Sequence, residues 1–95
     1  MQFNELFSRI IACNSISSVD PAIDQGNRPL VDLLANQLQD MGFECEVMAL
    51  STNKANLIAT RGRGPGGLVL AGHTDTVPCD ESLWNSDPFV LTERN

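Results

Sequence analysis

The fold is decided by one stretch of the sequence, Val69-Leu70-Ala71-Gly72-His73-Thr74-Asp75-Thr76-Val77-Pro78. It begins inside an apolar run, residues 68–71, which has no polar alternation. Such a run is typical of a strand that is covered on both faces inside an α/β sheet. The run ends at Gly72, and the only histidine of the chain follows it. We therefore expect a buried central strand over residues 68–71, with His73 at its carboxyl end.

Two polar residues follow this strand at a spacing of two. Side chains alternate along extended backbone, so His73 and Asp75 are expected to project to the same side. Ligands of open α/β sheets bind at the carboxyl ends of the strands. One interpretation of this spacing is a metal site in which His73 is a ligand and Asp75 orients the imidazole by accepting its far N–H. The His-x-Asp triplet also fits a strand end at which both side chains are merely solvated, and these residues alone leave both interpretations open.

The rest of the chain predicts an α/β fold. Apolar residues recur at helical spacing over residues 2–13, and again from Asn27, a plausible N-cap, to Gly42. The period then changes to two, which predicts a hairpin over residues 43–61. One more strand is expected over residues 89–92. The expected order is two N-terminal helices, a hairpin and a buried central strand of a mixed sheet. The two helices are expected to pack through Phe3, Phe7, Ile10, Leu30, Leu34 and Leu38.

The amino-acid composition and net charge exclude some classes of function. The 95 residues are enough for one small domain, and 42% hydrophobic with 19% charged residues is typical of a globular protein. The net charge of −6 argues against a nucleic-acid or anionic-membrane partner. No apolar run reaches membrane-spanning length. The cysteines lack C-x-x-C spacing and are expected to be free thiols in a cytoplasmic protein, with Cys79 a bystander near His73.

The same residues also carry a resemblance to a known family. The stretch from Gly72 to Pro78, with Trp84 and Asp87-Pro88-Phe89 after it, resembles the first signature of the M20 family of dinuclear zinc amidohydrolases and peptidases. The likeness extends over nearly the whole chain, including Ser15-Ile16-Ser17, Asp24-Gln25, residues 66–71 and Leu91-Thr92-Glu93.

The resemblance implies a zinc-peptidase-like catalytic domain that uses two divalent metal ions, zinc or possibly cobalt. It assigns His73 as a metal ligand and places Asp75 in the catalytic site beside it. It also implies a homodimer that acts on a small N-acetylated amino acid. Within the family, the strongest likeness is to enzymes that deacetylate N2-acetyl-L-ornithine in arginine biosynthesis.

The family's other ligands and its general base have no counterpart in residues 1–95. We therefore expect the chain to be the N-terminal part of a catalytic domain, without the dimerisation domain. Alone it should be inactive and should form at most a partial metal site. Two alternatives stay open. The first is a related enzyme with the same signature, such as a succinyl-diaminopimelate desuccinylase, an aminoacylase or a dipeptidase. The second is a non-catalytic folding or interaction module.

Overall fold

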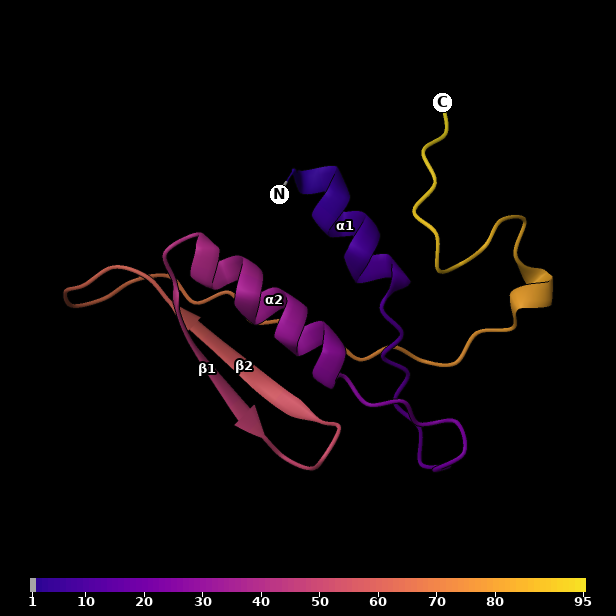
Figure 1. Ribbon diagram of the computed structural model, residues 1–95, viewed down its shortest axis with the longest axis horizontal. Helices are drawn as coiled ribbons and strands as arrows, with labels where there is room; N and C mark the ends of the chain where they lie inside the picture. Colours follow the sequence, from indigo (N-terminus) through magenta and orange to yellow (C-terminus); the bar gives the residue numbers. More distant parts are fainter. Residues whose placement is uncertain (1) are drawn as a thin grey trace.

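The computed structural model describes residues 2–95 and contains two helices and one antiparallel pair of strands (Figure 1). The presence of both helices and strands confirms the α/β class. No helix within the described range is long and apolar enough to cross a membrane. The elements in chain order are α1 (Phe3–Ala12), α2 (Arg28–Asp40), β1 (Glu44–Ala49), β2 (Ala55–Thr60) and a 3-10 turn (Glu81–Leu83).

Helix α2 begins and ends where the sequence predicted. Asn27 occupies the N-cap position, and Pro29 lies in the first turn, where its missing N–H costs no hydrogen bond. The helix ends at Asp40, and Gly42 follows with φ of +89°. This left-handed conformation is the one that glycine adopts readily after a helix.

The hairpin follows directly and is also as predicted. Strand β1 pairs with β2 in antiparallel register from Glu44 opposite Thr60 to Ala49 opposite Ala55. The connecting loop is closed by Leu50, whose backbone N–H donates to the Lys54 carbonyl at 2.8 Å. Alternate residues of β2 are at least partly buried, and the residues between them are exposed, as the period of two requires. Strand β1 shows the same alternation through Cys45 and Val47, but Ala49 at its end is exposed.

The core lies between α2 and the hairpin, and we call residues 27–60 the packed unit. Helix α2 packs against both strands, and Figure 1 shows the hairpin lying along it. The radius of gyration is 15.4 Å, against about 12 Å for a compact domain of this length. The chain is therefore less compact than one globular domain. The buried apolar side chains are Leu30, Val31, Ala35 and Ala55.

The predicted buried central strand is wrong for the described residues. Residues 68–71 form no strand, and Leu68, Val69 and Leu70 are 84%, 87% and 87% exposed. The physical reason is the lack of a neighbour: within residues 2–95, β1 and β2 pair only with each other. A cavity of about 1410 Å³ lies between β2 and residues 66–75. The strand expected over residues 89–92 is likewise absent from the described structure.

The predicted packing is confirmed for α2, whose Leu30 is buried, but it is wrong for α1. Helix α1 forms as expected but buries none of its residues, and its rings of Phe3 and Phe7 lie against each other with centroids 5.8 Å apart. The apolar face of α2 is covered by the hairpin instead, because the hairpin follows it directly in the sequence. A cavity of about 560 Å³ is lined by residues of both helices, among them Ile10, Ile11, Leu30 and Leu34.

Candidate functional site

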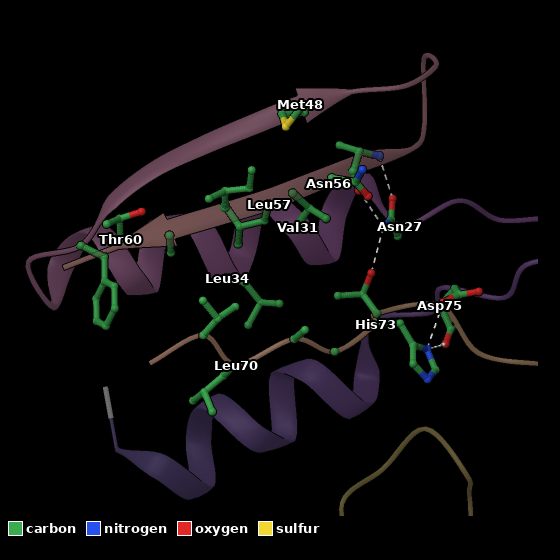
Figure 2. Close-up of a pocket in the computed structure, with 18 of the residues that line it drawn as sticks. Asn27, Val31, Leu34, Met48, Asn56, Leu57, Thr60, Leu70, His73 and Asp75 are labelled. Carbon is green, nitrogen blue, oxygen red and sulfur yellow. Dashed lines mark hydrogen bonds and ion pairs between the residues drawn. The ribbon is translucent and has the colours of Figure 1, made fainter. Parts of the chain in front are cut away.

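The structure brings the side chains of His73 and Asp75 together, as their spacing predicted. His73 Nδ1 lies 3.0 Å from Asp75 Oδ1 and 3.0 Å from the backbone oxygen of the same residue (Figure 2). Both oxygens are acceptors, so the proton of a neutral imidazole belongs on Nδ1. Nε2 is then left with its lone pair free. That tautomer is the one in which an imidazole binds a metal through Nε2.

The pair is open to solvent. The side chains of His73 and Asp75 are 83% and 54% exposed. An ion pair or hydrogen bond between such exposed groups contributes little to folding stability. The arrangement therefore adds little to the stability of the fold, and it leaves the imidazole accessible to a ligand.

The backbone beside the pair is tied to the loop that follows α1. Thr76 donates its backbone N–H to the Ser15 carbonyl at 3.0 Å and accepts from the Ser17 N–H at 2.9 Å. These bonds form an isolated parallel bridge between Ile16 and Thr76. Ser15 is 3% exposed, and its hydroxyl donates to the Thr74 carbonyl at 2.6 Å. The segment that carries the site is therefore anchored immediately after Asp75.

Asn27 provides a second anchor, which the sequence analysis missed. Its side chain does not cap α2. Instead, Nδ2 donates to Thr74 Oγ1 at 2.8 Å and to the Ala55 carbonyl at 2.9 Å, while Oδ1 accepts from the Ala55 N–H at 2.9 Å (Figure 2). Asn27 and Thr74 are 47 positions apart in the sequence, and no local pattern signals such a contact.

The loop before α2 is held by a carboxylate. Asp24 Oδ1 accepts from the Ser18 backbone N–H at 2.9 Å and from Lys54 Nζ at 3.0 Å. The Ser18 N–H, and after it Lys54, hold the pKa of this carboxyl below its ordinary value. These contacts attach the loop to the end of the hairpin.

The described residues do not form a complete metal site. Within residues 2–95, no group of three His, Cys, Asp or Glu side chains is arranged to hold an ion. A catalytic zinc needs about three protein ligands. His73 fits the role of one ligand, because its Nε2 is open and its Nδ1 is already paired. Cys13, Cys45 and Cys79 are free thiols.

Comparison with known proteins gives the chain a close set of relatives. No protein-family model matches it. It is 57% identical over 95 residues to the acetylornithine deacetylase of Photorhabdus laumondii, and 55% identical over 95 residues to that of Pasteurella multocida. The chain closely resembles acetylornithine deacetylase. The same enzyme of Vibrio parahaemolyticus is 48% identical over 93 residues.

The likeness to acetylornithine deacetylase covers nearly all of this chain but only part of each relative. Each of the three matches covers 98% of this chain and 25% of the relative. The chain therefore spans about a quarter of the length of the curated relatives it matches. The matches confirm the resemblance predicted from the residues around His73. The roles of His73 and Asp75 stay predictions.

Proposed function

We propose that this chain is part of a metal-dependent amide hydrolase that deacetylates N2-acetyl-L-ornithine to L-ornithine and acetate, a step of arginine biosynthesis. The high identity to proteins named acetylornithine deacetylase supports the reaction and the substrate. The observation that carries the proposal is the His73–Asp75 pair, which leaves Nε2 of the imidazole open.

In this proposal, each residue of the pair has a separate task. His73 holds one of two divalent ions, zinc or cobalt, through Nε2. Asp75 accepts the Nδ1 proton, which fixes the tautomer, orients the ring and makes Nε2 a more basic donor. When bound, the metal supplies the Lewis acidity that activates water and polarises the amide carbonyl. The chain's own contribution is therefore to hold and orient one ligand.

One histidine cannot hold such a site alone. The other ligands and the general base then belong to parts of the relatives that this chain does not span, and the 95-residue chain is expected to be inactive. We further propose a homodimeric, cytoplasmic enzyme. The three free cysteines support the assignment to a reducing compartment.

A chimera tests the proposal directly. This chain replaces the matching residues of the Photorhabdus laumondii enzyme, and the product is assayed for metal content and for hydrolysis of N2-acetyl-L-ornithine. We expect activity with that substrate and a clear preference over N-succinyl-diaminopimelate. His73→Ala should lose one metal ion, since a ligand is removed. A folded chimera whose metal content and activity are unchanged by His73→Ala would overturn the proposal.

A further inference from the structure

Thr74, the residue between His73 and Asp75, is tied to two distant parts of the chain. Its Oγ1 accepts from Asn27 Nδ2 at 2.8 Å, and its carbonyl accepts from the Ser15 hydroxyl at 2.6 Å. Thr74 is half-buried, whereas its two neighbours are exposed. Neighbouring side chains of extended backbone project to opposite sides. Fixing Thr74 against the protein therefore also fixes the direction in which His73 and Asp75 face.

Both anchors are themselves held firmly. Asn27 is bonded to the N–H and the carbonyl of Ala55, which is buried in the core. Ser15 is buried, and its carbonyl accepts the Thr76 N–H at 3.0 Å. A continuous series of hydrogen bonds thus leads from the core through Asn27 to Thr74. Figure 2 shows this series beside the paired side chains of His73 and Asp75.

We propose that Ser15 and Asn27 are positioning residues that act through Thr74 to hold the His73–Asp75 pair in the geometry that presents Nε2 to a divalent cation. This inference rests on the proposed function. Residues 61–73 are exposed and belong to no helix or strand, so the pair has little other support. Without the anchors, the segment has to be ordered when the cation binds, and that ordering reduces affinity.

Matched variants of the 95-residue chain test the inference. Thr74→Val keeps the branched shape but removes Oγ1, and Thr74→Ser restores a hydroxyl. Thr52→Val, in the exposed hairpin loop, is the control. Zinc affinity and ring tautomer are read from the NMR signals of His73, the only histidine. Thr74→Val should weaken zinc binding about 2- to 10-fold, the worth of one hydrogen bond, and reduce the Nδ1–H tautomer. Thr74→Ser and Thr52→Val should keep the original values.

One further measurement and one further variant complete the test. Amide hydrogen exchange at Thr76 should become faster in Thr74→Val, because the bridge beside the site loosens. Ser15→Ala removes the hydroxyl that donates to the Thr74 carbonyl and should change the zinc affinity and the tautomer in the same direction. This variant tests the inference if Thr74→Val unfolds α2.

The outcomes separate this inference from the proposed function. Unchanged zinc affinity and tautomer in folded Thr74→Val and Ser15→Ala would overturn the positioning role. Asp75→Asn removes the carboxylate charge that faces His73 Nδ1. If Asp75→Asn weakens zinc binding and the anchor variants do not, only the positioning role fails. If Asp75→Asn also has no effect, the orienting role that the proposed function gives to Asp75 fails.

Discussion

The packed unit and the apolar run of residues 68–71 are both rich in hydrophobic residues, yet only the first is buried. Val31 of α2 is 0% exposed, whereas Leu70 is 87% exposed. The helix and the hairpin complete their backbone hydrogen bonds within a few dozen residues. A central strand requires partners on both edges and cover on both faces. Hydrophobicity alone therefore does not bury a segment: the neighbours that would cover it must also be present.

The largest difference between the two regions is expected when one leucine in each is truncated. Leu30→Ala removes a buried side chain from the core and is expected to cost about 2–5 kcal/mol in the free energy of unfolding. Leu70→Ala alters an exposed side chain and should change it by less than about 0.5 kcal/mol. Urea unfolding followed by far-UV circular dichroism measures both. Equal losses in the two variants would show that the apolar run is packed in solution.

A pair of glycine substitutions gives a smaller effect. Gly26 has φ of +74°, and a Cβ added there would clash with the Asn53 carbonyl oxygen. That oxygen accepts the backbone N–H groups of Asn27 and Arg28 at the start of α2. Gly26→Ala should therefore cost about 1–3 kcal/mol, through strain in the left-handed region and displacement of this contact.

The matched substitution is Gly72→Ala, where an added Cβ meets nothing within 4 Å. In thermal unfolding, the midpoint of Gly72→Ala should be close to that of the original chain. If Gly26→Ala were equally harmless, the loop before α2 would not be held against Asn53 as described.

The smallest expected effect concerns pH, and it contrasts two aspartates. The pKa of Asp24 is lowered by the Ser18 N–H and by Lys54, which come from separate segments. The pKa of Asp80 is lowered by the hydroxyl and N–H of Ser82, two residues away. A lowered folded pKa contributes stability that is present above the unfolded pKa, about 3.9, and is lost as pH falls through the folded value.

Asp24→Asn should therefore reduce the unfolding midpoint at pH 7, and the difference from the original chain should shrink as pH falls below about 4. Asp80→Asn should leave the midpoint of the packed unit unchanged at every pH, because its bonds are local to the exposed 3-10 turn. A pH-independent difference for Asp24→Asn would contradict its role as a charged acceptor.

The sequence predicts those parts of the fold that depend on local rules. Asn27, Pro29 and Gly42 mark the ends of α2 through the conformations that helix ends require, and alternation identifies the hairpin. The state of residues 68–71 could not be predicted in this way, because a strand is decided by its neighbours. The apolar face of α2 was recognised, but its periodicity does not say whether α1 or the hairpin covers it.

The candidate site likewise has a part that local rules predict and a part that they do not. The pairing of His73 with Asp75 follows from a spacing of two residues, so the sequence alone placed the two side chains together. The anchors could not be found there. Ser15 and Thr74 are 59 positions apart, and Asn27 already had a sufficient explanation as the N-cap of α2. Contacts of this kind become visible only when the fold brings the segments together.

The most direct test of this account is the protonation of the single imidazole, read from the ring nitrogen shifts of His73 before and after zinc is added. The account predicts that neutral His73 carries its proton on Nδ1, next to Asp75. It also predicts that zinc binds at Nε2 and that the proton stays on Nδ1. A proton on Nε2, or zinc bound at Nδ1, would contradict it.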